Sequence, residues 1–427
     1  MVNMTKAIIF LWGIALLFCS IINVSRSLPA PGNDVKVIDV RKYYHKPTQE
    51  EIEYDDEYVP GSYHDAFAEA WDVACRKTTG PVKILVPKGK FLLPPIMFSG
   101  PCISAKPIVF EVEGTIIAPT NPSLYPNAEW ITFADLDSLV LNGNGVFDGQ
   151  GGVVDPETKA SAWGVNDCKT NKNCVPPSSN LRFERVQNSI VTGITSLNSK
   201  WFHYHVFMCN NFTATDLHII APKDSPNTDG MHLSESTLVN VANTVIETGD
   251  DCISIGQGCT NVNIHNVICG PGHGISVGSL GKERTDKSVV GVTVTDCTFI
   301  NTTNGARIKT WIGKGHGEAK NIIFDNLIMN NVKNPVVIDQ SYGSKKKRAP
   351  STSLWKISDT HFRRIRGTTT SSVAVSLQCS SKNPCEGVEV SDIDLTYVGP
   401  SKTVALTSSC ANAMAKFGGK LTTGACQ

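Results

Sequence analysis

The sequence predicts an all-β fold, a single-stranded right-handed parallel β-helix, from three observations. First, a pattern of apolar, any, apolar, any, then Asn or Asp recurs seven times, ending at Asp216, Asn243, Asn266, Asp296, Asn326, Asp359 and Asp392. Second, these polar residues are 27, 23, 30, 30, 33 and 33 positions apart, which is typical of stacked coils. Third, few helical stretches lie between the copies. A β-sandwich, the rival fold, would need hairpin turns and strands every ~8–12 residues.

Each copy of the pattern is expected to form a strand that ends in a turn. Alternation with a period of two indicates a strand with one buried face, so the apolar residues of stacked coils share one interior. The closing Asn or Asp has a short side chain that bonds to the nearby backbone and tolerates a left-handed conformation. We therefore expect these residues to turn the chain at the end of each strand.

The region before the repeats is expected to cap the solenoid. Residues 62–77 carry apolar residues at helical spacing, namely Ala66, Phe67, Ala70, Trp71 and Ala74. A short helix here would cover the open end of the solenoid and its edge strand. The acidic stretch 50–57 is expected to be a solvated loop, and residues 83–93 to form the first pair of strands.

The first 27 residues have the layout of a secretory signal peptide. Lys6 precedes an apolar run over residues 7–22, and small or polar residues follow up to Ser27. The run is short for a membrane span, so a retained signal anchor is the weaker alternative. We expect residues 1–27 to be removed and residues 28–427 to form a single exported domain.

The charge balance gives no general attraction to polyanions. The chain carries 39 basic and 39 acidic residues, a formal net charge of zero. Because the net charge is zero, we expect no nucleic-acid partner. Because no second long apolar run follows the signal, we expect no membrane contact in the mature chain. A polyanionic ligand would have to be steered by a local patch of cations.

Fourteen cysteines include Cys19 of the signal peptide, and export favours pairing of the others. Short spacings suggest the pairs Cys168–Cys174, Cys379–Cys385 and Cys410–Cys426, with Cys252–Cys269 and Cys75–Cys102 as further candidates. The odd remainder leaves at least one free thiol, expected to be buried. The absence of a Cys-x-x-Cys pair argues against a metal site, and Asn211 and Asn301 each begin an N-glycosylation sequon.

Three aspartates and one histidine are candidates for a site. Asp229 and Asp251 are 22 residues apart, and Asp250 and His273 are 23 apart, about the length of one coil. Aligning the strands that follow them places Asp229 beside Asp251 and, one residue earlier, Asp250 beside His273. Neighbouring rungs lie ~4.8 Å apart. We therefore expect the four side chains to converge on one patch.

This cluster suits general acid/base hydrolysis of an acetal. Three neighbouring carboxylates repel one another, so at least one is expected to have a raised pKa and to hold a proton for a leaving oxygen. The ionised ones can activate water on the other side of the sugar. An acid and a base ~6.5–9.5 Å apart give inversion at the anomeric carbon.

Two cations are expected to point outward on the same face. Arg307 and Lys309 alternate with inward apolar residues near the end that carries the aspartates. Arginine offers a planar fork and lysine a point charge for a carboxylate, which indicates a uronic acid rather than a neutral sugar. Tyr342, after the following strand, can stack on a sugar ring or bond to it.

Structural alternatives remain open for each residue taken alone. Asn and Asp at solenoid turns often form structural ladders, Asp-Asp pairs occur in calcium loops, and His273 has a structural reading as a partner of Asp250. The basic run 345–348 either widens the cationic rim or is a solvated loop. The conjunction of six charged residues on one face favours a site.

The motifs Asn227-Thr228-Asp229, Gly249-Asp250-Asp251, Gly272-His273-Gly274 and Arg307-Ile308-Lys309 resemble the four signature motifs of polygalacturonases, glycoside hydrolase family 28. The likeness runs through most of the mature chain, and the cysteine-rich C-terminus resembles pollen-type plant members. The resemblance implies hydrolysis of α-1,4-linked galacturonan without a cofactor or metal. It implies Asp250 as proton donor, Asp229 and Asp251 as activators of water, and His273 as a partner of the acid. Substrate binding would fall to Asn227, Arg307, Lys309 and Tyr342.

Several functions remain in competition. The pollen-type likeness favours exo action, with endo action as the alternative. A calcium-dependent pectate lyase and a non-catalytic wall-binding solenoid are the rivals from other classes. The expected partner is pectic polysaccharide, met by a monomer outside the cell or in the cell wall.

Overall fold

The computed structural model describes residues 35–45, 61–125, 127–168, 171, 174–313, 315–344, 352–401 and 404–426. The expected signal peptide, the acidic stretch 50–57 and the basic run 345–348 lie outside the described residues. Residues 36–427 form one compact unit. Among the described residues, no helix has both the length and the apolar character that crossing a membrane requires.

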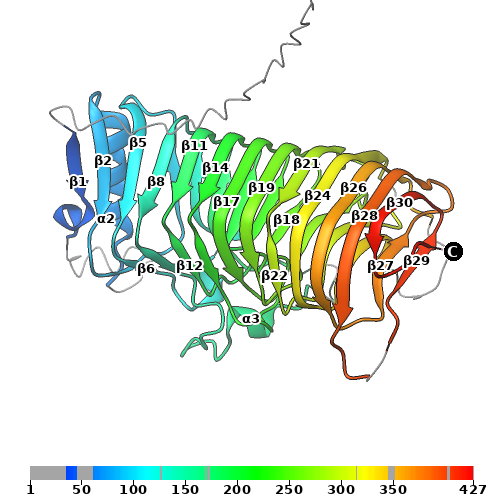
Figure 1. Cartoon of the computed structure of the whole chain (residues 1–427). Coiled ribbons are helices and arrows are strands. Elements are labelled where there is room, and N and C mark those ends of the chain that lie inside the picture. The colour runs from blue at the N-terminus through cyan, green and yellow to red at the C-terminus, as the bar shows by residue number, and fades with distance from the viewer. Residues whose placement is uncertain are drawn as a thin grey trace, which may run out of the picture. The chain divides into compact units, whose positions relative to one another are not determined.

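The unit is a right-handed parallel β-helix, as predicted, in which the strands of successive coils lie side by side (Figure 1). One sheet has eleven strands, one from each coil, and every pairing within it is parallel. In chain order they are β4 (Ile96–Ser99), β7 (Glu129–Ala134), β10 (Ser179–Glu184), β13 (Tyr204–Phe207), β16 (Met231–Ser234), β18 (Ile253–Ile255), β20 (Ile275–Leu280), β23 (Asn304–Trp311), β25 (Asn334–Tyr342), β27 (Val373–Gln378) and β29 (Thr407–Ala411).

The other sheet has nineteen strands, because most coils contribute two short strands or one long bent one. They are β1 (Lys36–Asp39), β2 (Pro81–Val86), β3 (Lys90–Leu92), β5 (Ala105–Val112), β6 (Thr115–Ile117), β8 (Leu139–Gly143), β9 (Val146–Asp148), β11 (Gln187–Thr192), β12 (Thr195–Leu197), β14 (Asn210–Thr215), β15 (His218–Ile220), β17 (Thr237–Glu247), β19 (Thr260–Cys269), β21 (Val289–Thr295), β22 (Thr298–Ile300), β24 (Gly317–Val332), β26 (Trp355–Thr369), β28 (Cys385–Tyr397) and β30 (Ala413–Leu421). The helical segments are η1 (Val40–Tyr43), α2 (His64–Asp72), η2 (Val73–Lys77), η3 (Pro122–Leu124) and α3 (Ala162–Val165).

The interior is built from the apolar positions of the repeat. The register pairs Phe212 with Val239, Val239 with Val262, and Val262 with Val292, and these side chains are buried. Each coil leaves one apolar face that only its neighbours can cover, so stacking them removes a continuous apolar surface from water.

The turns follow the predicted chemistry. All seven Asn and Asp residues that close the repeats have positive φ, between 49° and 57°, the left-handed region that these residues tolerate. Some of them also bond to one another along the stack. Asn266 Nδ2 donates to Asn243 Oδ1 at 2.8 Å, which adds a polar ladder to the outside of the corner.

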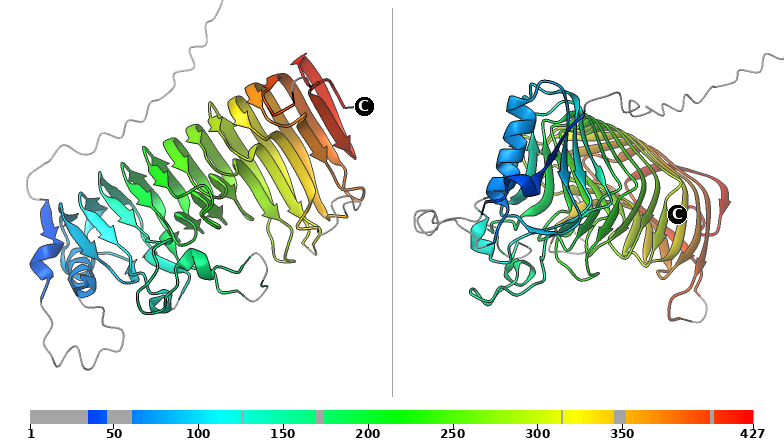
Figure 2. Two further views of the ribbon diagram at one scale, coloured as in Figure 1. Left: turned by 90° about the horizontal axis from the view of Figure 1, so that it is seen from below. Right: turned by 90° about the vertical axis from the view of Figure 1, so that its left-hand side faces the viewer.

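The predicted capping helix is present as α2, continued by the π-helical turn η2 (Figure 2). Phe67 of α2 packs on Phe91 and Phe110, with ring centroids 6.2 and 6.5 Å apart. One expectation is wrong: residues 83–93 are not the first strands, because β1 pairs in parallel with β2 and precedes it. In β1 only Ile38 is buried, so the strand carries too little alternation to be recognised.

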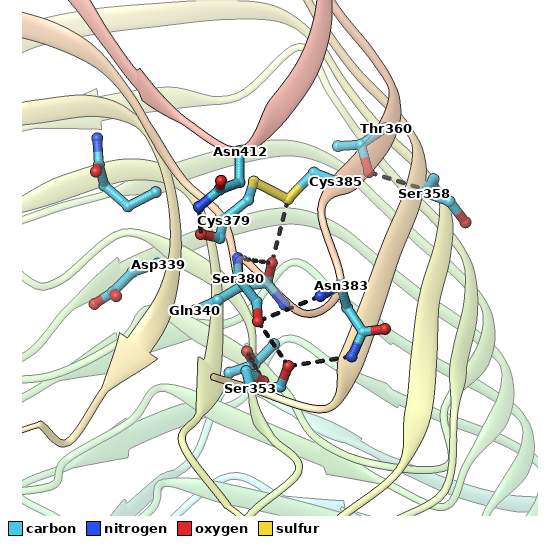
Figure 3. Close-up of a disulfide and its surroundings, with 12 residues drawn as sticks. Asp339, Gln340, Ser353, Ser358, Thr360, Cys379, Ser380, Asn383, Cys385 and Asn412 are labelled. Atoms are coloured by element: carbon cyan, nitrogen blue, oxygen red, sulfur yellow. Dashed lines mark hydrogen bonds between the residues drawn. A yellow bond between two sulfur atoms is a disulfide. The ribbon is translucent and has the colours of Figure 1, made fainter. Parts of the chain in front are cut away.

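All five suggested disulfides are present, joining Cys75–Cys102, Cys168–Cys174, Cys252–Cys269, Cys379–Cys385 and Cys410–Cys426. Cys209, Cys259 and Cys297 are free and buried. Figure 3 shows how the Cys379–Cys385 bridge is tied to earlier coils. Gln340 accepts from the backbone of Ser380 at 2.8 Å and donates to the carbonyl of Trp355 at 2.7 Å.

Candidate active site

The eleven-stranded sheet brings the predicted aspartates together. Met231 of β16 pairs with Ile253 of β18, so Asp229 and Asp251, each two residues before its strand, lie at the same level on neighbouring rungs. Both are buried, with 7% and 1% of their surface exposed. The side chain of Asp250 is 24% exposed. The exposed carboxyl group therefore belongs to the middle residue of the three.

The position of His273 differs from the predicted column. Ile253 pairs with Ile275, which puts His273 level with Asp251 instead of Asp250. The strands pair with a constant offset of 22 residues, from Met231 to Ile253 and from Ile253 to Ile275, so His273 follows Asp251 in this column and the predicted alignment was one residue off. His273 Nδ1 still lies 2.9 Å from Asp250 Oδ1, so the predicted pair of side chains forms.

Asp251 is surrounded by cations. Its Oδ1 accepts from Arg307 at 2.6 Å and from Ser276 Oγ at 3.0 Å, while its Oδ2 accepts from Lys309 Nζ at 2.7 Å. Burial alone would raise the pKa of Asp251, but the charges of Arg307 and Lys309 outweigh it and hold the pKa below its usual range. These contacts therefore favour the ionised form of Asp251.

Asp229 is in the opposite electrostatic situation. Its Oδ2 accepts from Ser254 Oγ at 2.7 Å. Burial, together with the negative charges of Asp250 and Asp251, raises the pKa of Asp229 well above its usual range. One carboxyl pKa of the cluster is thus raised, as expected, and it is that of Asp229; burial is the first cause and the neighbouring carboxylates are the second.

The substrate-binding candidates line the same face. Lys309 Nζ lies 5.1 Å from the ring centroid of Tyr342, and Arg307 and Lys309 both reach Asp251 from β23. Asn227 Oδ1 is 3.4 Å from Nδ2 of Asn166, just after α3. All eight predicted site residues thus lie on or beside β16, β18, β20, β23 and β25.

Reasoning from sequence missed three polar residues of the site: His232, Ser254 and Ser276. Ser254 and Ser276 each follow an aspartate by 25 positions, from Asp229 and from Asp251, and point outward from otherwise apolar strands. This repeated offset was the signal that could have found them. A polar residue in an outward position between two buried ones needs a partner on that face.

One triplet has the spacing of a cation site. Ligand atoms of Asp250, Asp251 and His273 lie within 4.8 Å of one another. Both oxygens of Asp251 already accept from cationic side chains, so the triplet offers a divalent ion little uncompensated charge. This arrangement favours acid/base chemistry over metal coordination.

The same face of the eleven-stranded sheet carries a second arginine, Arg182, on the N-terminal side of the aspartates. Arg182 of β10 donates to Glu129 at 2.6 Å and to Glu184 at 2.9 Å, and lies 3.1 Å from His205 Nδ1. Arg182, Glu129 and Glu184 border a hollow of about 520 Å³ next to β4 and β7. The charge of Arg182 is already compensated by two carboxylates.

The comparisons with known proteins agree with this geometry. The family model for glycosyl hydrolases family 28 matches residues 75–419. An exopolygalacturonase of Platanus acerifolia is 43% identical over 363 residues, covering 84% of this chain and 93% of that relative. An exopolygalacturonase of Oenothera organensis is 45% identical over 357 residues, covering 83% and 95%.

Among solved structures, a hyperthermoactive exopolygalacturonase from Thermotoga maritima superposes with a TM-score of 0.68, covering 91% of both chains at 17% identity. At that identity the likeness supports the fold alone. The sequence matches over most of the chain carry the assignment further. The chain belongs to glycosyl hydrolases family 28 and is a glycoside hydrolase.

Proposed function

We propose that this enzyme hydrolyses the α-1,4-galacturonosyl linkages of polygalacturonan by a single displacement with inversion. One observation carries the proposal: three carboxyl groups from two adjacent coils meet beside Arg307 and Lys309 on one sheet face. Acid/base hydrolysis needs one protonated and one ionised carboxyl group across the glycosidic bond. The cations supply what a uronic acid requires and a neutral sugar does not.

Asp250 is assigned as the proton donor. It is the most exposed of the three carboxyl groups, and His273 at 2.9 Å can hold or return its proton. The family resemblance supports this choice, whereas the raised pKa lies on Asp229. The two facts are compatible, because a base with a raised pKa binds a proton from water more strongly once it is ionised. Asp229, with Asp251 beside it, is therefore assigned to activate water.

We assign a substrate-binding role to Arg307, Lys309 and Tyr342. They would bind the carboxylate of the sugar that lies toward the C-terminal end of the solenoid, next to the scissile bond. Among the described residues, Asp251 is the carboxylate within ion-pair distance of both cations, and each cation has more N–H donors than this contact uses, which leaves donors for a substrate carboxylate. Tyr342 adds a ring and a hydroxyl beside Lys309. Asn227 lies at the other edge of the aspartate cluster, where a sugar hydroxyl is its natural partner.

Exo action is favoured by the difference in charge between the two sides of the aspartate cluster on this sheet face. A polyanion gains from Arg307 and Lys309 on the C-terminal side, where two cations share one ion-paired carboxylate, and gains little near Arg182, which pairs with Glu129 and Glu184. A chain bound at its end therefore fits better than one that extends across both sides. The relatives from Platanus and Oenothera are both exopolygalacturonases.

We further propose that the enzyme is secreted to the cell wall after loss of residues 1–27 and acts there as a monomer, without nucleic-acid or membrane partners. The five disulfides support an oxidising compartment. Asn211 and Asn301, the two sequon residues, are exposed.

The test is an assay of purified enzyme on polygalacturonate. We expect new reducing ends without the ultraviolet absorbance of an unsaturated product, and monomer as the product from the outset. Asp250→Asn should lose activity, while Asp65→Asn on α2, whose side chain is fully exposed, should keep it. An unsaturated product that disappears with a calcium chelator would replace the proposal by a lyase, and an early ladder of oligomers would indicate endo action. No turnover at all would favour a non-catalytic solenoid.

A further inference from the structure

The two buried aspartates are held by the same kind of partner. Ser254 Oγ donates to Asp229 Oδ2 at 2.7 Å, and Ser276 Oγ donates to Asp251 Oδ1 at 3.0 Å. Each serine lies in the strand one coil further on, at the same outward position. The hydroxyl groups alone cannot make the two carboxylates different.

The residue behind each serine differs. Arg307 Nε donates to Ser276 Oγ at 2.9 Å, and Arg307 also reaches Asp251 directly. Ser254 instead contacts His232, which is paired with it on the strand one coil earlier and whose Nδ1 lies 2.8 Å from Ser254 Oγ. One aspartate is therefore supported by a permanent cation and the other by an imidazole.

The imidazole of His232 is fixed and neutral. Its ring stacks on Phe202, with centroids 4.7 Å apart and an angle of 24°. Burial, and secondly the neighbouring His205, lower the pKa of His232 to about 3. His232 therefore supplies a hydrogen bond without a positive charge over the acidic and neutral range.

We propose that His232 is a positioning residue for the base: through Ser254 it orients and supports the ionised carboxylate of Asp229. The inference rests on the proposed function, in which Asp229 activates water. When Asp229 is ionised, Ser254 donates its hydroxyl hydrogen to it, so the serine oxygen accepts the hydrogen bond from Nδ1–H of His232. The chain of donors thus selects the Nδ1–H tautomer and one orientation of the carboxylate.

The charged surroundings of this chain stay the same when it is cut. Asp229 also faces Asp250, Asp251 and Lys309, and His232 faces His205, Lys309 and Asp251. Substitution of His232 or Ser254 leaves all of these in place. A change in the titration of Asp229 then reports the loss of the hydrogen bond.

The test compares His232→Leu, His232→Asn, Ser254→Ala and, as the matched control on the other aspartate, Ser276→Ala. For each, kcat and KM on polygalacturonate are measured from acidic to neutral pH. His232→Leu and Ser254→Ala should move the acidic limb of the kcat profile upward by about 0.4–1 pH unit, the value of one hydrogen bond to the ionised form. His232→Asn, whose amide nitrogen can replace Nδ1 as donor, should restore the limb. Ser276→Ala should leave the limb unmoved, because Arg307 and Lys309 still hold Asp251 ionised.

A loss that is equal at every pH, and not restored by His232→Asn, would overturn the proposal in favour of a structural role. An unmoved limb in Ser254→Ala would overturn it as well. That variant removes one oxygen and keeps His232, so it carries the test if His232→Leu does not fold. Should the parent enzyme release no reducing ends, the proposed function fails separately. The relay is then read from the pH dependence of Tm: the effect of Asp229→Asn must shift to higher pH in the Ser254→Ala background, and an unshifted effect contradicts the relay.

Discussion

Arg182 and Arg307 occupy the same column of outward residues in the eleven-stranded sheet, five strands apart. Their side chains are nearly equally exposed, 17% and 14%. Arg182 pairs with Glu129 and Glu184, and Arg185 beside it pairs with Glu184 and Asp135, so three carboxylates stand against two arginines. Arg307 and Lys309 together pair with one carboxylate, that of Asp251. The two arginines therefore have the same place in the backbone and opposite local balances of charge, and under the proposed function this balance sets which side attracts an acidic polymer.

The largest expected effect comes from removing Arg307, which shares Asp251 with Lys309. Arg307→Gln should lower kcat/KM on polygalacturonate by about 100- to 1000-fold, as expected when one partner of a buried charge pair is lost. The same substitution at Arg182 should cost less than about tenfold, because that arginine has no charge to spare for substrate. Equal losses of kcat/KM in the two variants would show that Arg307 and Arg182 do not differ in their contribution to substrate binding.

Removing the two carboxylates that pair with Arg182 should make its side of the sheet face bind substrate more like the side of Arg307. In a Glu129→Gln, Glu184→Gln variant the arginine becomes free to bind a substrate carboxylate, so the chain can extend across the N-terminal half. We expect a several-fold larger share of oligomers among the early products, measured by chromatography of a time course. Monomer alone, as from the parent enzyme, would mean that charge does not limit extension. Glu111→Gln, which removes a negative charge from a glutamate of β5 paired with Lys83, serves as a control for the loss of negative charge.

Ionic strength should have a smaller effect than these substitutions, and it should act on substrate binding at Lys309 and not at Arg182. Raising the ionic strength should increase KM on polygalacturonate by a few-fold, because screening weakens the attraction between the polymer and the cationic half. Lys309→Gln should flatten this dependence, whereas Arg182→Gln should leave it unchanged. A salt dependence that survives loss of Lys309 would place the attracting charge elsewhere.

The smallest effect is on stability, and it has opposite signs for the two buried aspartates. The pKa of Asp229 is raised in the folded state, so its contribution is present below the pKa of the unfolded chain and is lost as pH rises through the folded pKa. Asp229→Asn should therefore raise Tm at neutral pH, by about 1–3 °C, and the gain should vanish in acid. The pKa of Asp251 is lowered, so its contribution is lost as pH falls, and Asp251→Asn should lower Tm at neutral pH. Scanning calorimetry at two pH values checks both signs.

Much of the fold was predictable because it repeats. The Asn or Asp turns, the cap around Phe67 and the five disulfides follow from spacing and local propensity. Strand β1 was missed because one buried side chain in four gives no periodic signal. His273 was placed one position off because the predicted column did not keep the constant offset of 22 residues with which these strands pair.

The site was predictable in its charges and not in its hydrogen bonds. Arg307 and Lys309 are recognisable because they are charged residues within an otherwise apolar strand, and Asp229, Asp250 and Asp251 because they recur at the spacing of one coil just before their strands. Which carboxyl group has the raised pKa depends on side chains from three further coils, and no sequence spacing encodes that sum. The pairing of Arg182 with Glu129, 53 residues away, likewise depends on the register of the sheet.

Carboxyl groups from adjacent coils are proposed to activate a water molecule that displaces the leaving sugar directly, with inversion at the anomeric carbon. Proton NMR of the first products from polygalacturonate distinguishes this mechanism from the others, because the anomeric signals can be recorded before mutarotation mixes the anomers. We expect β-galacturonate first, with the α-anomer growing in later. The α-anomer first, or a product with a double bond, would rule out single displacement by these carboxyl groups.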